Sequence, residues 1–143
     1  MPRFVVIRWR ELGESVRALL LDELNPYACE ELAGMLPVES IQSHAVVAGS
    51  QMYAPIRFAP EREKCRFENM AAQPEGRVNI ELDFQYFSIN YGPMTEAVPA
   101  LAVAQVVEED LPRLREIGRK VWDNLLNGQT YIHVFIEEGG ERA

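Results

Sequence analysis

Apolar and polar residues alternate along several short stretches of this chain, with a period of two that is typical of a β-strand with one buried face. In the first stretch, Val5, Ile7 and Trp9 fall on one face and are separated by Val6 and Arg8. The same kind of pattern predicts eight strands, over residues 4–10, 15–21, 41–47, 51–58, 78–83, 86–91, 101–107 and 131–136. The sequence therefore predicts a mainly β protein.

Two other segments carry apolar residues at helical spacing. The first begins at Asn25, a good N-cap followed by Pro26 in the first turn, and ends at Pro37. The second begins at Asp110, with Pro112 in its first turn. The apolar stripes are Ala28, Cys29, Leu32, Met35 and Leu36 in the first helix, and Leu111, Leu114, Ile117, Val121, Trp122 and Leu125 in the second. Both segments are predicted to be amphipathic helices.

The order of the predicted elements is two strands, a helix, five strands, a second helix and a final strand. Many short strands in 143 residues favour closure into a barrel, which removes exposed strand edges. We therefore predict a closed eight-stranded antiparallel β-barrel capped by two α-helices, in a single domain over residues 1–143. Residues 59–77, rich in charge and containing prolines and a glycine, are expected to form a long loop of the kind that is often functional or mobile.

Charge and composition exclude several classes of partner. The chain has 14 Lys and Arg against 22 Asp and Glu, a net charge of −8. An acidic surface repels phosphate backbones and anionic lipids, so neither nucleic acid nor a membrane is expected as a partner. No apolar run approaches the length of a membrane span, and no signal-peptide pattern follows the N-terminus. Cys29 and Cys65 are interpreted as reduced thiols, which places the protein in the cytoplasm.

Three places in the chain resemble the cyclophilin-like fold. The segment Asn-Pro-Tyr-Ala-Cys-Glu-Glu-Leu at 25–32 is similar to a helix start of that fold. Ser-His-Ala-Val-Val at 43–47 is similar to the Phe-His-Arg-Val-Ile strand of true cyclophilins. The ending, a strand at 101–107, a helix and a strand at 131–136, has the same order of elements. The resemblance covers nearly the whole chain.

A closer resemblance is to small bacterial cyclophilin-like proteins of unknown function. Their recurring pattern is matched here by His44-Ala45, Gly49, Tyr53 and Asn-Tyr-Gly at 90–92. Cyclophilins carry a catalytic arginine after the histidine, where this chain has Ala45. Alanine has no side-chain donor to polarise a proline amide, so prolyl isomerase activity is not expected.

His44, Tyr53 and Tyr91 are the candidate ligand-binding residues. A neutral imidazole at a barrel mouth can hydrogen-bond a polar ligand or act as a base near pH 7, and the resemblance repeats a histidine at this position. Tyrosine rings supply apolar contact, and their hydroxyls orient a ligand. The alternative is a structural histidine bonded to the backbone, with the two tyrosines in ordinary barrel packing.

No catalytic residue, metal or cofactor is assigned. Glu81, Asp83 and Glu96 are carboxylates near predicted strand ends and are candidates to pair with His44. Cys29 lies on an apolar helix stripe, which favours a buried thiol over a reactive one. The histidines and cysteines are scattered, and no phosphate loop or dinucleotide fingerprint is present.

Three functions are therefore open. The leading hypothesis is a small-molecule-binding barrel, as an enzyme or an enzyme accessory acting on a carbonyl or amide compound. The second is a degenerate prolyl isomerase or peptide-binding module. The third is an oligomeric interaction protein without a ligand, for which a homodimer is the expected form.

Overall fold

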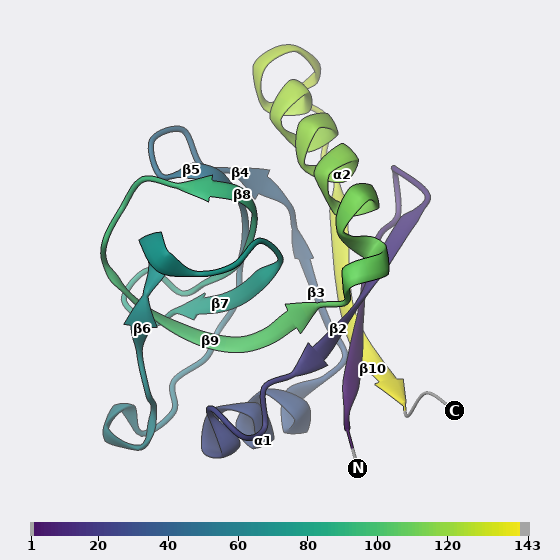
Figure 1. Cartoon of the computed structure of the whole chain (residues 1–143). Helices are drawn as coiled ribbons and strands as arrows, with labels where there is room; N and C mark the ends of the chain where they lie inside the picture. The colour runs from purple at the N-terminus through teal and green to yellow at the C-terminus, as the bar shows by residue number, and fades with distance from the viewer. Residues whose placement is uncertain (1, 141–143) are drawn as a thin grey trace.

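The computed structural model describes residues 2–140 and shows a nearly closed antiparallel β-barrel with two α-helices (Figure 1). Nine strands follow one another in the order β3-β10-β1-β2-β9-β7-β8-β5-β4. Their bounds are Phe4–Trp9 (β1), Glu14–Leu20 (β2), Val38–Ile41 (β3), Ser43–His44 (β4), Gly49–Pro55 (β5), Arg77–Glu81 (β7), Tyr86–Met94 (β8), Pro99–Val106 (β9) and His133–Gly140 (β10). The predicted fold class, a mainly β barrel with two helices, is confirmed.

The barrel closes where the chain bends between β3 and β4. β3 pairs with β10, whereas β4 pairs with β5 at the other end of the strand order. Gln42 lies buried at the bend. Its side-chain oxygen accepts from the indole N–H of Trp9 at 2.8 Å, and its nitrogen donates to the carbonyl of Tyr53 at 2.8 Å. Nine strands thus replace the eight predicted: in place of one strand at 41–47, the chain forms β3, which shares only Ile41 with that range, and the two-residue β4.

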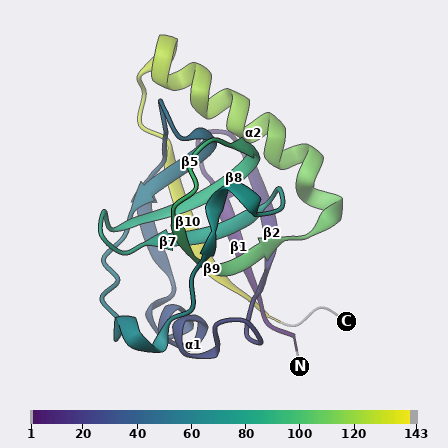
Figure 2. The ribbon, with the colours of Figure 1, turned by 60° about the vertical axis from the view of Figure 1, so that its left-hand side comes forward.

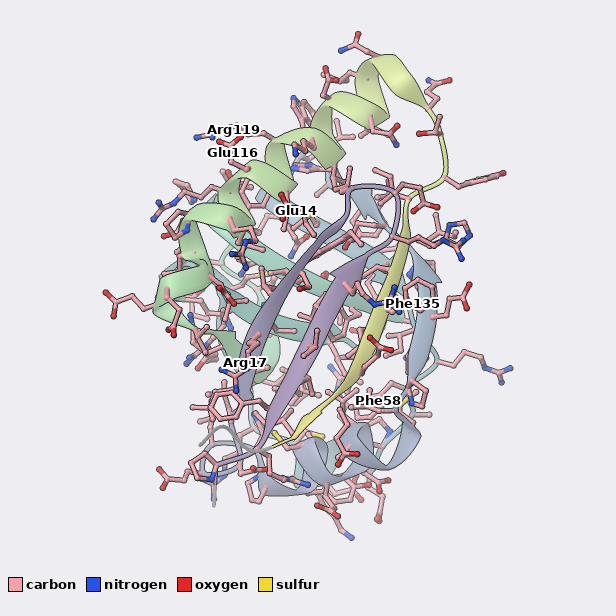
Figure 3. All side chains as sticks on the ribbon, turned by 90° about the vertical axis from the view of Figure 1, so that its right-hand side faces the viewer. Glu14, Arg17, Phe58, Glu116, Arg119 and Phe135 are labelled. Carbon is pink, nitrogen blue, oxygen red and sulfur yellow. The ribbon has the colours of Figure 1, made fainter. Side chains whose placement is uncertain are left out.

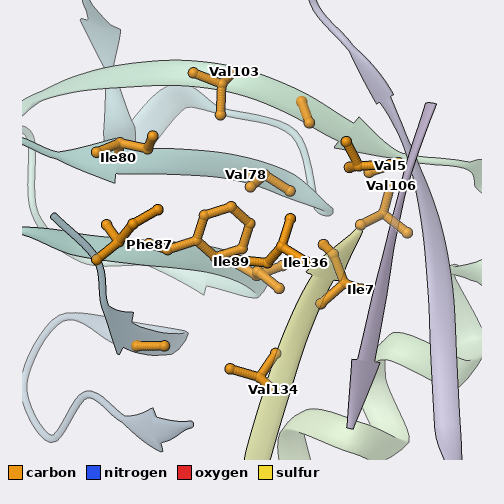
Figure 4. Close-up of a cluster of buried hydrophobic side chains, with 14 of the residues drawn as sticks. Val5, Ile7, Val78, Ile80, Phe87, Ile89, Val103, Val106, Val134 and Ile136 are labelled. Atoms are coloured by element: carbon orange, nitrogen blue, oxygen red, sulfur yellow. The ribbon is translucent and has the colours of Figure 1, made fainter. Parts of the chain in front are cut away.

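Side chains that point inward fill the barrel (Figure 4). Ile7 and Ile136 come from neighbouring strands, and Ile80, Phe87 and Val103 face them from the opposite side of the barrel; all are buried. Burying a side chain of this size contributes roughly 1.5–3 kcal/mol relative to leaving it in water. The interior is therefore a packed core rather than an open channel.

The two helices, α1 (Pro26–Met35) and α2 (Leu111–Asp123), lie on opposite sides of the barrel (Figure 1 and Figure 2). Asn25 and Asp110 precede them as predicted, but neither side chain caps its helix. The Asn25 amide donates instead to the carbonyl of Ala102 at 2.8 Å, and the Asp110 carboxylate accepts from the backbone N–H of Arg17 at 2.9 Å. These bonds attach each helix start to the barrel. Neither helix, nor any other within residues 2–140, is long and apolar enough to cross a membrane.

Residues 59–77, expected as a loop, are held against the outside of the barrel. They contain η1 (Arg62–Lys64), β6 (Glu68–Asn69) and η2 (Met70–Ala72), and β6 pairs with β9. Met70 is buried, and the Gln73 amide exchanges hydrogen bonds of 2.8 and 2.9 Å with Asn79 and accepts one of 2.9 Å from Asn90. Because both asparagines are buried, this segment covers a polar layer on the outer face of the barrel.

The solvent-facing side of β1, β2 and β10 carries arginines over aromatic rings (Figure 3). The guanidinium carbon of Arg17 lies 4.1 Å from the centre of the Phe4 ring, and that of Arg8 lies 4.3 Å from the centre of the Phe135 ring. Arg8 also pairs with Glu137 at 3.2 Å. These cation–π contacts occupy the arginines on this face.

Candidate functional site

The structure brings two of the predicted ligand-binding residues, His44 and Tyr91, into direct contact. His44 is 4% exposed. Its Nδ1 lies 2.6 Å from the carbonyl oxygen of Ala45, and its Nε2 lies 2.6 Å from the hydroxyl of Tyr91. A carbonyl only accepts, so Nδ1 carries the proton and Nε2 accepts from the tyrosine hydroxyl. Burial lowers the pKa of His44, although the Ala45 carbonyl acts in the opposite direction, and the neutral ring is favoured.

Helix α2 covers this pair. The Trp122 ring centre lies 4.7 Å from that of His44. Gly118 lies so close to the Tyr91 ring that a β-carbon at position 118 would come within 2.5 Å of it. Burial raises the pKa of Tyr91, which keeps its hydroxyl protonated. The polar atoms of His44 and Tyr91 are thus satisfied by each other and by the backbone, within the packing of α2 on the barrel.

Tyr53, the third predicted residue, lies elsewhere. In the β4–β5 pair, His44 is opposite Met52, whose side chain is buried in the core, and Tyr53 is opposite Ser43. Neighbouring strand residues point to opposite faces, so Tyr53 points away from the core. Its ring lies 4.3 Å from that of Tyr86, centre to centre, on the outer face of the barrel.

A cavity of about 690 Å³ lies outside the barrel, where β2 leads into α1. We call it the β2–α1 cavity. It is lined by Pro2, Leu19, Leu20, Leu21, Asp22, Glu23, Leu24, Glu68 and Arg77. The strand register explains how distant segments meet here, because Leu19 of β2 and Arg77 of β7 are both opposite Gln105 of β9. The volume is within the range of about 300–1,000 Å³ that is usual for small-molecule sites.

Charged side chains in the β2–α1 cavity are held in fixed positions. Arg77 donates to both carboxylate oxygens of Glu68, at 2.8 and 3.1 Å, and to the side-chain oxygen of Gln105 at 3.2 Å. This fork-shaped contact holds the pKa of Glu68 below its ordinary value, so the carboxylate is ionised. Asp22 receives two hydrogen bonds from Arg3, at 3.1 and 2.5 Å. Apolar walls and fixed charges therefore meet in one place.

Sequence reasoning did not find this cavity. Glu68 and Arg77 lie in the segment that was expected to be a loop, and nothing in the local pattern places β6 beside β9. No set of three or more His, Cys, Asp or Glu side chains able to hold a metal ion occurs within the described part of the chain.

Comparison with known proteins adds to the description of the fold. No protein-family description matches the sequence, and no curated protein matches it. A structure of McbB in complex with tryptophan is similar over 97% of this chain, with 33% identity and a TM-score of 0.84. The chain spans 46% of the length of that solved McbB chain. The hypothetical protein AF2241 from Archaeoglobus fulgidus is similar over 96% of this chain and 95% of its own, with a TM-score of 0.59.

These likenesses define a class: a nearly closed β-barrel similar to a protein whose structure holds a small molecule. AF2241 is 12% identical and supports the fold alone. The resemblance to cyclophilin-like proteins is not established by these matches and stays a prediction.

Proposed function

We propose that this chain binds a small amphipathic molecule in the β2–α1 cavity. The observation that carries the proposal is the cavity itself, about 690 Å³ in volume, which is lined by leucines and by the Glu68–Arg77 ion pair. Apolar walls with a few fixed polar groups are the usual composition of a small-molecule site. The apolar part of a ligand gains stabilisation from burial against the leucines, and the charged groups set its orientation.

A molecule with both charges and an apolar body fits this lining best. Arg77 has N–H donors beyond its bonds to Glu68 and Gln105 and can face a ligand carboxylate, and the carboxylate of Glu23 can accept from an ammonium group. The McbB structure holds tryptophan, an amino acid with both charges and a large apolar ring. A reaction at a carbonyl or amide group of the bound molecule would use Glu23 as the proton acceptor, because Asp22 and Glu68 are each paired with an arginine.

Tryptophan is therefore the first probe, measured by titration calorimetry and thermal unfolding. A ligand at a hundred times its Kd adds roughly 2.7 kcal/mol of stability, which gives a visible shift in Tm. Leu21→Arg places a bulky cation in the cavity and is expected to weaken binding at least about tenfold, or about 1.4 kcal/mol. Leu126→Arg is the matched control, because Leu126 is exposed and does not line the cavity.

Two results would contradict the proposal. One is wild-type affinity in Leu21→Arg, and the other is no thermal shift with tryptophan or any related amino acid. The same titration tests the predicted roles of His44 and Tyr91. Tyr91→Phe removes a hydroxyl already bonded to His44 and is expected to leave tryptophan affinity unchanged.

A further inference from the structure

Two buried polar atoms on the outer face of the barrel have no hydrogen-bond partner among the described residues. They are Oε2 of Glu81 and Oγ of Ser88. Ser88 is 0% exposed, and Glu81 is half-buried. A buried polar group without a partner costs about 1–3 kcal/mol, and more if it is charged, so each such group requires an explanation.

The strand register places these two atoms beside a pair of tyrosines. Glu81 of β7 is opposite Tyr86 of β8, and Ser88 of β8 is opposite Tyr53 of β5. The neighbouring residues Ile80 and Phe87 point into the core, so these four side chains share the outer face.

The Glu81 carboxylate has no ion-pair partner among the described residues. Burial raises its pKa, contact with the Ser88 hydroxyl lowers it in part, and the negative charge of Glu96 raises it further. Glu81 therefore has no cationic side chain as a partner among the described residues.

The aromatic rings near Glu81 can contact the organic part of a cation. The Tyr53 and Tyr86 rings are 4.3 Å apart, and the Phe84 ring, 69% exposed, lies 6.0 Å from that of Tyr86 in a nearly parallel arrangement. Ring faces attract cations and pack against flat apolar groups.

We infer that Glu81 and Ser88, together with the Tyr53–Tyr86 ring pair, form a binding site for a small organic ammonium ion, separate from the β2–α1 cavity. An ammonium group has three donors and no acceptor, whereas the Glu81 carboxylate is a strong acceptor and the Ser88 hydroxyl can accept as well. The ammonium supplies a positive charge, and the organic part lies against the tyrosine rings. This inference does not depend on the function proposed for the cavity.

Benzylamine is the probe. Benzyl alcohol and benzoate are the control ligands, because they contain the same ring but carry a different charge. Amide chemical shifts of the intact protein report both the affinity and the place of binding. We expect saturable shifts in β7 and β8, with benzylamine bound more tightly than either of the other two. Glu81→Gln is expected to weaken benzylamine about tenfold to a hundredfold, because it removes charge-assisted hydrogen bonds. Binding of benzyl alcohol should change little.

Asp83→Asn is the matched control. Asp83 lies two positions beyond Glu81, its side chain is 77% exposed, and it pairs with Arg62 at the surface, so its loss is expected to change benzylamine affinity less than about twofold. Glu81→Gln keeps the shape of the side chain and removes an unpaired, half-buried charge, so it is expected to fold.

Three outcomes would overturn the inference: no saturable benzylamine binding to the wild type, equal affinity in Glu81→Gln, or loss of benzylamine binding in Leu21→Arg. The last would place the amine in the β2–α1 cavity. Failure of tryptophan to bind that cavity would leave this inference standing.

Discussion

His44 shows how two hydrogen bonds and burial hold one residue in one protonation state. Its Nδ1 donates to the backbone, and its Nε2 accepts from Tyr91, so both ring nitrogens are occupied in the neutral form. A second proton on the ring would turn Nε2 into a donor facing a hydroxyl hydrogen. The Tyr91 hydroxyl would then have to reorient beneath α2.

This arrangement predicts a pH dependence of stability. The pKa of His44 in the folded chain lies below its ordinary value of 6.5, so the unfolded chain binds the proton more readily. The contribution of His44 to stability is therefore complete above about pH 6.5 and is lost as the pH falls below it. We expect His44→Gln to reduce the pH dependence of urea unfolding between about pH 5 and 7. The same dependence in wild type and variant would contradict this.

At the scale of elements, strand parity decides which side chains meet. The period of two correctly predicted the buried face of Val5, Ile7 and Trp9, because that rule depends only on local sequence. Applied to β5, the same rule puts Tyr53 and Met52 on opposite faces of the strand. The sequence pattern therefore already indicated that these two side chains do not point the same way. The ion pair of Glu68 and Arg77 had no such signal, because it depends on β6 pairing with a strand about thirty residues later.

The contact of α2 with the barrel gives a prediction at this scale. A β-carbon at position 118 would lie 2.5 Å from the Tyr91 ring, which the bond to His44 holds in place. Gly118→Ala is therefore expected to lower the free energy of unfolding by about 1–3 kcal/mol, as overpacking usually does. Gly34→Ala in α1 is the matched control.

Gly34 has no atom within 4 Å of its β-carbon position, so alanine there is expected to raise stability by up to about 1 kcal/mol. Chemical denaturation of the two variants measures the contrast. Equal effects of the two substitutions would show that the contact between α2 and Tyr91 is not tight.

At the scale of the whole molecule, one buried amide links two strands that are far apart in the strand order. Gln42 connects Trp9 of β1 to the backbone of β5, across the bend between β3 and β4. The indole N–H of Trp9 is buried and the Tyr53 carbonyl is in a part-buried contact, so each group needs a hydrogen-bond partner. Closure of the barrel therefore depends on a polar contact as well as on the apolar core.

Gln42→Leu is expected to cost about 1–3 kcal/mol, because it leaves the indole N–H of Trp9 without its partner. In a Trp9→Phe background, which has no N–H to satisfy, the same change is expected to cost less. Urea unfolding of the four proteins forms a double-mutant cycle that isolates the Trp9–Gln42 interaction. Simple additivity would assign the loss to the bend rather than to this bond.

The packed interior of the barrel has a consequence for how the protein can change over time. The Glu81 site lies on the outer face of β7 and β8, whereas the core is built from the inward residues of the same strands, and the β2–α1 cavity is lined largely by residues 21–24, which follow β2. Inward and outward residues alternate, so an outward substitution alters what is recognised without opening a void among the inward ones. A protein with this barrel can thus acquire a different ligand through substitutions at the outward positions of a strand, while the inward residues that form the core stay unchanged.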